Sequence, residues 1–300
     1  MFRTIEELVN LADQQHIAIS EVMIRTEMET TGRSREDIFS KMSRNLEVME
    51  QAVQRGINED IKSRSGLSGG DARKLQAYLK NKQPLSGTVL LDSVSKAMAT
   101  NEVNAAMGTI CATPTAGSAG VVPGVLFGLQ SKLHPSREQM VDFLFTAGAF
   151  GFVIANNASI SGAAGGCQAE VGSATGMAAA AAVELAGGTP EQSAHAMAIA
   201  LANMLGLICD PVAGLVEAPC VKRNAIGASS AIVAADMALA GIKSLIPCDE
   251  VIDAMYRVGR MMPVALRETA LGGLADTKTG RALKKQIFGS DAQSSMIKEQ

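Results

Sequence analysis

Aromatic residues are nearly absent from this 300-residue sequence, which has no tryptophan, two tyrosines and eight phenylalanines. Charged residues are also scarce, at 19% of the chain against 47% hydrophobic residues. The core must therefore be filled by aliphatic side chains and by the 16 methionines, whose unbranched side chains fit irregular gaps. With 29 glycines and many alanines, the sequence predicts helices that pack at short interaxial distances.

An excess of positive charge is missing as well, since the formal net charge is −3. Nucleic acid binding depends on a basic face, so we expect no nucleic acid partner. The first segment, MFRTIEELVN, contains acidic residues and no apolar run, which argues against a secretory signal. The odd number of cysteines, five, does not suggest a disulfide framework. We therefore expect a cytoplasmic protein.

Long uninterrupted apolar runs are missing too. A membrane-spanning helix needs about 20 apolar residues with few charges. The two most apolar segments are 143–158, which ends beside Asn156, and 225–247, which contains Asp236 and Lys243. We interpret both as buried helices of a large core, and we expect no membrane partner.

Helix start signals are frequent, whereas no segment has a strong strand pattern. A serine or threonine with a polar side chain three residues later marks predicted N-termini at Thr4, Ser34, Ser136 and Thr189. In the last case a proline follows directly, which is the residue preferred at the first helical position. The sequence therefore predicts an all-α fold.

The composition changes at about residue 86. Before it, apolar residues recur at helical spacing on otherwise polar segments, so we expect peripheral amphipathic helices over residues 1–85. Small residues dominate afterwards, and we expect the core and the site within residues 86–276. We predict that these parts form one catalytic domain over residues 1–300.

Three of the five cysteines fall at predicted helix ends. Cys167 precedes an alanine-rich helix, and the next helix is expected to run until near Cys209, because Pro211 follows it. A third helix is expected to begin after Cys220 and to reach about Ala240. Helix ends carry unpaired backbone groups, and the N–H groups at an N-terminus can stabilise a thiolate.

Two interpretations of these cysteines stay open at this point. Free cysteines are commonly small buried hydrophobic residues, and a three-thiolate metal site is the alternative. Zinc is not favoured, because the sequence has no CxxC pair and its three histidines are not at ligand spacing from a cysteine. No role is predicted for Cys111 or Cys248.

The segment TPTAGSAG (113–120) is rich in hydroxyl residues and glycine. Such a loop is either an ordinary tight turn or an anion site, because glycine lets backbone N–H groups approach a ligand and hydroxyls add donors. The trio Lys222, Arg223 and Asn224 either adds charge beside Cys220 or is a solvated helix start.

Four further polar residues stand in apolar surroundings, and any of them is a candidate general base, an orienting group or a structural cap. They are Lys96, Glu102, Asn104 and Glu170. None is preferred from the sequence, so the catalytic residue is left unassigned.

Several long motifs occur in one order along the chain. They are NAAMGTICATPTAGSAGVVPG, GGCQAEVGSATGMAAAA, CDPVAGLVEAPCVKRNAIGA and RETALGGLA. Together they resemble the iron–sulfur L-serine dehydratases of bacteria over roughly residues 86–276. The resemblance is closest to the separate alpha chain of the two-chain form.

The resemblance implies that Cys167, Cys209 and Cys220 hold a [4Fe–4S] cluster. With three protein ligands, one iron would remain open to act as a Lewis acid on the substrate hydroxyl while L-serine is converted to pyruvate and ammonia. The resemblance also favours the 113–120 loop as the substrate loop. Its expected substrate-binding residues are Thr113, Thr115, Gly117, Ser118 and Gly120.

The resemblance further implies a separate beta chain that carries a regulatory domain, and hence a hetero-oligomer. The chain ends in MIKEQ, so no cysteine ligand is expected from its tail. Two alternatives stay open: a related L-cysteine desulfidase and a noncatalytic iron–sulfur subunit. The sequence does not separate serine from threonine or cysteine as the substrate.

Overall fold

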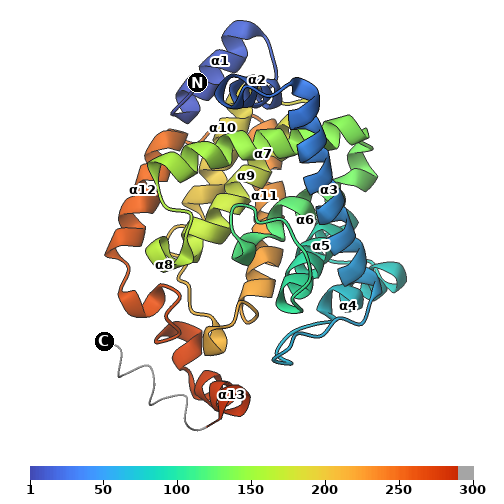
Figure 1. Cartoon of the computed structure of the whole chain (residues 1–300), viewed down its shortest axis with the longest axis vertical. Coiled ribbons are helices and arrows are strands. Elements are labelled where there is room, and N and C mark those ends of the chain that lie inside the picture. The colour runs from blue at the N-terminus through green and yellow to red at the C-terminus, as the bar shows by residue number, and fades with distance from the viewer. Residues whose placement is uncertain (290–300) are drawn as a thin grey trace.

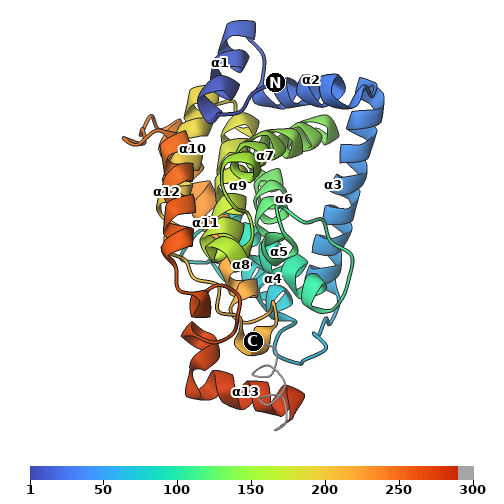
Figure 2. The same cartoon turned by 60° about the vertical axis from the view of Figure 1, so that its left-hand side comes forward.

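The computed structural model describes residues 1–289, and its architecture is all-α, as predicted (Figures 1 and 2). The MIKEQ tail lies outside the described residues. The helices are α1 (Ile5–Gln15), α2 (Ile19–Thr31), α3 (Arg35–Asn58), α4 (Asp71–Asn81), α5 (Thr88–Ala105), α6 (Val121–Leu133), α7 (Arg137–Asn157), α8 (Gly162–Gly165), α9 (Ser173–Leu185), α10 (Pro190–Ala202), α11 (Cys220–Leu239), α12 (Cys248–Met261) and α13 (Lys278–Phe288).

Short helical turns connect several of these helices. Four are 3₁₀ turns and one, η2, is a π-helical turn: η1 (Ala116–Ser118), η2 (Gln168–Gly172), η3 (Val212–Gly214), η4 (Val264–Leu266) and η5 (Gly273–Asp276). Across residues 1–289, a single isolated bridge between Cys209 and Arg267 is the one strand-like pairing.

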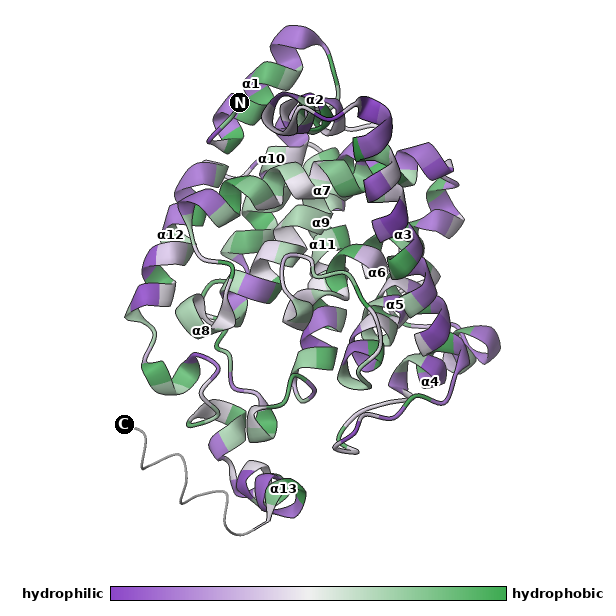
Figure 3. Ribbon diagram, in the orientation of Figure 1, coloured by the Kyte–Doolittle hydropathy of each residue, from purple (hydrophilic) through white to green (hydrophobic). Residues whose placement is uncertain are grey.

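Helix α9 is the centre of the molecule. Every residue from Ser173 to Val183 is buried, and the helix packs against α6, α7, α10 and α11. A helix that is apolar on all sides has to be surrounded in this way. Its alanines keep the helix narrow, so four neighbours fit around it, and the ribbon is most apolar in this region (Figure 3).

The outer helices are amphipathic and lie around this centre, with their polar sides outward (Figure 3). In α3 the buried residues include Ile38, Leu46, Met49 and Val53, a spacing that places them on one side of the helix. These side chains join the same hydrophobic cluster as the alanines of α9. Helix α3 therefore shares the central core, as do α1, α2 and α12, while the division at residue 85 stays a prediction.

The N-cap signals predicted helix starts well. Ser136 and Thr189 both form reciprocal capping boxes with the glutamine three residues later, and Ser34 accepts a hydrogen bond from the Asp37 N–H. The Thr4 hydroxyl accepts from the Glu7 N–H as expected. The carboxylate of Glu7, however, accepts from Arg3 N–H, so this cap is not reciprocal.

One helix end was predicted wrongly. Helix α10 ends at Ala202 rather than near Cys209. The chain then turns through Gly206, whose φ of +80° lies in the left-handed region, a conformation that glycine adopts without steric cost. The seven residues 203–209 thus form an irregular approach to Cys209 rather than helix, and this approach shapes the site.

Helix α7 is long and apolar enough to span a membrane by length and composition, although 61% of its most apolar window is buried within the fold. It packs against α9 and α2. A core helix that is covered by its neighbours passes the same test of length and composition.

Helices α5 and α6 approach each other through glycine. A Cβ atom at Gly120 would lie 2.2 Å from the Ala97 carbonyl oxygen, and one at Gly124 would lie 2.6 Å from the Ala97 Cβ. Both distances are too short for van der Waals contact, so these positions accept no side chain. The close contact fixes where α6 begins, directly after the 113–120 loop.

Replacing Gly124 by alanine tests this contact. We expect Gly124→Ala to lower the free energy of unfolding by about 1–3 kcal/mol, because the added methyl group overpacks the α5–α6 contact. Gly148 lies inside α7, and a Cβ atom there would meet no atom of a neighbouring segment within 4 Å. The control Gly148→Ala should raise stability by up to about 1 kcal/mol. Urea denaturation measures both changes, and equal effects would contradict the assignment.

A group of carboxylates lies where α2 meets α7 and α9. Glu184 accepts hydrogen bonds from Ile19 N–H at 2.7 Å and from the Thr146 hydroxyl at 2.6 Å. Burial, together with the nearby carboxylates of Glu138 and Glu184, raises the pKa of Asp142 to about 6. The folded chain therefore holds a proton on Asp142 more tightly than the unfolded chain does.

The sign of this shift predicts a pH-dependent stability effect. Below the unfolded pKa, near 3.8, Asp142 is protonated in both states and costs nothing. As the pH rises through about 6, the ionised carboxylate opposes folding. Asp142→Asn should therefore stabilise the chain at pH 8 by about 1 kcal/mol, discounted for partial exposure. Urea denaturation should show that this gain in stability disappears near pH 4. The control Asp253→Asn, at an exposed position, should change the stability by the same amount at pH 8 and at pH 4.

Candidate functional site

Cys167 lies where α8 leads into the π-helical turn η2. The next residue, Gln168, is fully buried and holds this segment on two sides. Its backbone N–H donates to Leu207 O, and its side-chain oxygen accepts from Gly206 N–H, both at 2.9 Å. Its side-chain amide donates to Met255 O of α12 at 2.9 Å. These bonds set Cys167 beside the 203–209 approach to Cys209.

The structure brings two of the three predicted cysteines, Cys167 and Cys209, together. The sulfur atoms of Cys167 and Cys209 and a carboxylate oxygen of Glu170 all lie within 4.8 Å of one another. Cys220 is buried at the first position of α11, and its sulfur is not one of the atoms of this 4.8 Å group. Two segments that are distant in the sequence therefore supply two adjacent buried sulfurs, and Cys220 is a third buried sulfur outside that group.

The protonation of these sulfurs differs with their surroundings. The hydrogen bond from Cys209 and the positive charge of Arg223 hold the pKa of Cys167 below its usual value. The same Cys167–Cys209 contact, with burial, raises the pKa of Cys209. Burial and the Cys167 charge raise the pKa of Cys220 to about 12. Of the three, Cys167 therefore loses its proton most readily.

The 113–120 loop is an ordered turn in front of α6. The Ser118 hydroxyl donates to Thr113 O at 3.0 Å and lies 3.2 Å from the Thr115 hydroxyl. Thr115 and Ser118 form a reciprocal capping box around η1. Gly120 is the N-cap residue of α6, so the loop lies at the electropositive end of a helix of 13 residues.

Three asparagine side chains hold this loop from behind. Asn224 of α11 donates to Gly117 O at 2.8 Å and accepts from Gly120 N–H at 3.0 Å. Asn101 of α5 also donates to Gly117 O, and Asn104 donates to Ala116 O, each at 3.2 Å. Because the amides bind the loop carbonyls, the turn is fixed by two helices. Sequence reasoning missed Asn101, since nothing in its surroundings in the sequence marks it.

Glu170 lies between the loop and the cysteines. A Cβ atom at Gly117 would lie 2.9 Å from its Oε2 atom, and one at Gly162 would lie 3.1 Å from both its Cδ atom and the Cys209 sulfur. Burial, followed by the charge of Glu268, raises the pKa of Glu170. Of the four polar candidates, Glu170 alone adjoins the sulfurs, and its carboxyl joins the two halves of the site.

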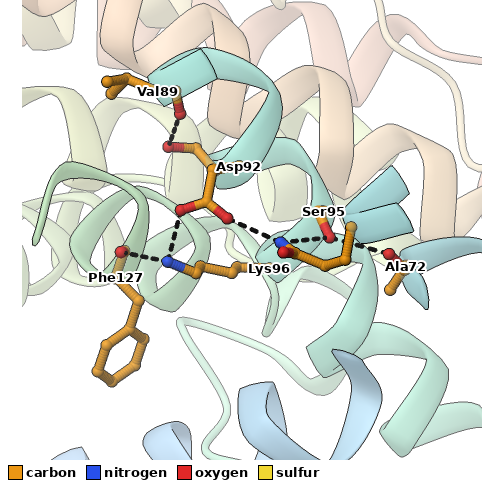
Figure 4. Close-up of polar contacts among 8 residues, drawn as sticks. Ala72, Val89, Asp92, Ser95, Lys96 and Phe127 are labelled. Atoms are coloured by element: carbon orange, nitrogen blue, oxygen red, sulfur yellow. Dashed lines mark hydrogen bonds and ion pairs between the residues drawn. The ribbon is translucent and has the colours of Figure 1, made fainter. Parts of the chain in front are cut away.

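Lys96 and Glu102 serve the fold elsewhere. The Lys96 ammonium contacts Asp92 at 2.6 Å and donates to Phe127 O at 2.7 Å, which links α5 to α6 (Figure 4). Glu102 accepts from Asp71 N–H at 2.7 Å and so caps the start of α4. The pKa of Glu102 is raised by its burial. Asn104 holds the loop and is an amide, so Glu170 is the candidate that remains beside the sulfurs.

The three polar residues after Cys220 separate in space. The Lys222 side chain is 76% exposed and points toward Asp71, 3.7 Å away. Asn224 is fully buried behind the loop. The Arg223 guanidinium donates to Ile208 O at 2.9 Å and lies 3.6 Å from the Cys167 sulfur. Arg223 thus supplies the charge that the sequence suggested, and Lys222 is a solvated residue.

The remaining two cysteines, Cys111 and Cys248, lie apart from Cys167 and Cys209. Cys111 is half-buried, its thiol donates to Asn45 O at 3.5 Å, and it borders a separate cavity of about 190 Å³ beside Thr113. Cys248 is buried at the start of α12 within the hydrophobic core. Neither belongs to the sulfur group at Cys167.

The donors present fit a thiolate-held metal group. Sulfur ligands are preferred by iron–sulfur clusters and other soft metal centres. The wall next to Cys209 is kept free of side chains at Gly162. At Gly166, whose φ is +76°, a Cβ atom would lie 2.6 Å from the Met262 sulfur and 2.9 Å from Leu207 O. The site thus has two adjacent sulfurs and one carboxylate, and glycines form part of the wall beside Cys209.

Comparisons with known proteins agree on one family. The sequence model described as serine dehydratase alpha chain matches residues 14–275. A probable L-serine dehydratase alpha chain of Bacillus subtilis (strain 168) is 71% identical over 96% of both chains. The L-serine dehydratase alpha chain of Peptoniphilus asaccharolyticus is 40% identical over 96% of this chain and 99% of its own. An L-serine dehydratase of Escherichia coli (strain K12) is 37% identical over 91% of this chain and 61% of its own length.

Proposed function

This chain belongs to the serine dehydratase alpha chain family, a family of ammonia-lyases, and from that premise we propose that it converts L-serine to pyruvate and ammonia. One observation carries the proposal. The sulfurs of Cys167 and Cys209 lie against Glu170, and Glu170 lies against Gly117 of the anion-type loop. A metal-binding group and a carboxylate-binding loop therefore face the same space.

Cys167, Cys209 and Cys220 would hold a [4Fe–4S] cluster in this proposal. When bound, such a cluster supplies a Lewis-acidic iron for the leaving hydroxyl, because three protein ligands leave one iron without a side-chain ligand. The surroundings of Cys167 hold its pKa below the usual value, which eases the loss of the thiol proton that metal binding requires. Burial of the three sulfurs excludes water from the site.

The 113–120 loop would bind the carboxylate of L-serine. The candidate binding residues are Thr113, Thr115, Gly117, Ser118 and Gly120. The Ser118 hydroxyl and the Gly120 N–H already donate to Thr113 O and to Asn224, so they would hold the turn, while the Thr115 hydroxyl and the Gly117 N–H would donate to the substrate. The N-terminus of α6 adds a favourable potential for an anion. Because asparagine side chains already hold the loop carbonyls, the loop loses little conformational entropy on binding.

Glu170 would orient the other end of the substrate. Its carboxyl lies beside Gly117 of the loop and beside Gly162, and this position suits an ammonium group next to the bound carboxylate. Lys96 and Glu102 are engaged elsewhere. The proposal also includes a separate beta chain, which the alpha-chain names of the relatives imply, and we propose that this chain completes the site. The regulatory domain of the beta chain and the cytoplasmic location of this protein stay predictions.

The central experiment removes one sulfur. The full chain, prepared with its beta chain and loaded anaerobically with ferrous iron and sulfide, should hold about four iron atoms and form pyruvate from L-serine. Cys167→Ala should lose the cluster absorbance, and pyruvate formation should fall at least about 100-fold. The control Cys248→Ala removes a buried thiol outside the site and should retain both.

Other outcomes of the same experiment would overturn parts of the proposal. Bound zinc, or one iron without sulfide, would contradict the cluster. Sulfide release from L-cysteine in place of pyruvate from L-serine would indicate a desulfidase. A loaded protein that turns over neither amino acid would be a noncatalytic iron–sulfur subunit.

A substitution behind the loop tests the carboxylate site separately. Asn104→Ala removes the hydrogen bond to Ala116 O, which loosens the turn without touching a sulfur. Loss of one such bond is worth about 1 kcal/mol, so KM for L-serine should rise about 5-fold while kcat stays nearly constant. Asn58→Ala, at an exposed position of α3, is the control. A fall in kcat at unchanged KM would argue against this role of the loop.

A further inference from the structure

One guanidinium group joins all three segments that carry the clustered cysteines. Arg223 extends from α11, the helix that begins at Cys220. Its Nη1 atom donates to Ile208 O at 2.9 Å and lies 3.6 Å from the Cys167 sulfur. Its Nη2 atom lies 2.8 Å from an oxygen of Asp210. Arg223 thus contacts both neighbours of Cys209 and the sulfur of Cys167.

Asp210 carries this connection onward to residues 264–276. Its side chain is 1% exposed, and its second oxygen accepts from Leu274 N–H at 2.6 Å. A Cβ atom at Gly273, whose φ is +60°, would lie 2.3 Å from that oxygen. Glycine is therefore required at this position both by the backbone conformation and by the approach of the carboxylate.

The backbone of Cys209 is held by the same segment. Its N–H donates to Leu266 O at 2.8 Å, and its carbonyl accepts from Glu268 N–H at 2.7 Å. Cys209 is therefore fixed through its own backbone, through Asp210 and through Arg223. No comparable side-chain connection among residues 1–289 links all three cysteine segments at once.

A buried ion pair is an expensive way to stabilise a fold. Removing two charges from water costs several kcal/mol, which apolar side chains of similar volume would avoid. What the arginine provides is geometry, because its planar fork presents several N–H donors at fixed angles. A lysine ammonium has no such fork and would not satisfy Ile208 O, Asp210 and the Cys167 sulfur together.

We propose that Arg223 is a positioning residue for the metal group: it holds the three cysteine segments in register and donates an N–H group to the Cys167 sulfur in the loaded protein. This inference rests on the proposed function, since it presupposes the cluster. Asp210 is the anchor of Arg223, and residues 264–276 support that anchor.

The test replaces Arg223 in the full chain loaded anaerobically with ferrous iron and sulfide. Arg223→Met should release iron to an excess of EDTA at least about 10-fold faster than the unsubstituted chain, as losses of supporting contacts typically do. The reduction potential of the remaining cluster should become more negative, because a hydrogen bond to sulfur and a nearby positive charge are gone. Arg223→Lys keeps the positive charge but not the planar fork. Its reduction potential should therefore lie near that of the unsubstituted chain, while its iron release should remain faster.

Lys222→Met is the matched control, since Lys222 is the preceding residue and its side chain is 76% exposed. It should leave both the rate and the potential unchanged. Circular dichroism before loading confirms that each variant is folded. If Arg223→Met does not fold, Arg223→Lys decides, and an EDTA release rate equal to that of the unsubstituted chain overturns the proposal.

Two failures are distinguishable. If the unsubstituted chain takes up no iron and sulfide, the proposed function fails. If the unsubstituted chain is loaded and a folded Arg223→Met keeps the same release rate and potential, the cluster stands and the positioning role is wrong. If Arg223→Met releases iron faster but the reduction potential is unchanged, Arg223 positions the cysteine segments, and the proposed hydrogen bond to the Cys167 sulfur is wrong.

Discussion

The contact of glycine with backbone is the constraint on which the site depends. Gly120 and Gly124 lie against Ala97 so closely that no side chain fits between α6 and α5. This contact places the first turn of α6, and with it the 113–120 loop. The loop is then held from both α5 and α11 by Asn101 and Asn224. Glycine and alanine at this contact therefore determine the position of the polar groups of the 113–120 loop.

Charge at the site follows from this close packing. Arg223 is paired with Asp210, and its positive charge still lowers the pKa of Cys167. Burial raises the pKa values of Glu170 and Cys220, since a low-dielectric interior disfavours anions. A site with several potential anions and one paired cation is electrostatically suited to a metal group, because a metal's own positive charge favours the ionised forms of its ligands.

Local sequence signals predicted much of the fold. The caps at Ser136 and Thr189 are local hydrogen bonds between residues three apart, so the sequence contains all that determines them. The start of α11, which was expected directly after Cys220, lies at Cys220 itself. The end of α10 was not, because Pro211 only limits how far a helix can run. The actual end at Ala202 depends on Gln168, which binds the following turn from a distant segment.

The site residues were predictable in type but not in role. The motifs indicated Cys167, Cys209 and Cys220, and the fold brings Cys167 and Cys209 together, while the part of Cys220 stays a prediction. Lys222 and Arg223 are adjacent and chemically alike, yet successive positions of a helix differ by about 100° in direction. One side chain is therefore solvated and the other contacts a sulfur. The packing of the whole helix determines which of the two side chains faces the site. The sequence of α11 does not reveal this packing, because small residues occur on several sides of the helix.

The RETALGGLA motif shows the same limit from the opposite direction. It marked the resemblance without suggesting a role. In the structure Glu268 and Ala270 have φ values of +63° and +54°, a left-handed conformation that costs a side-chain-bearing residue about 1–2 kcal/mol. The hydrogen bonds of Cys209 with Leu266 O and Glu268 N–H lie at this bend. A bend that is costly for the chain, and that ends at Gly273 against Asp210, is best explained by the need to hold Cys209 in place.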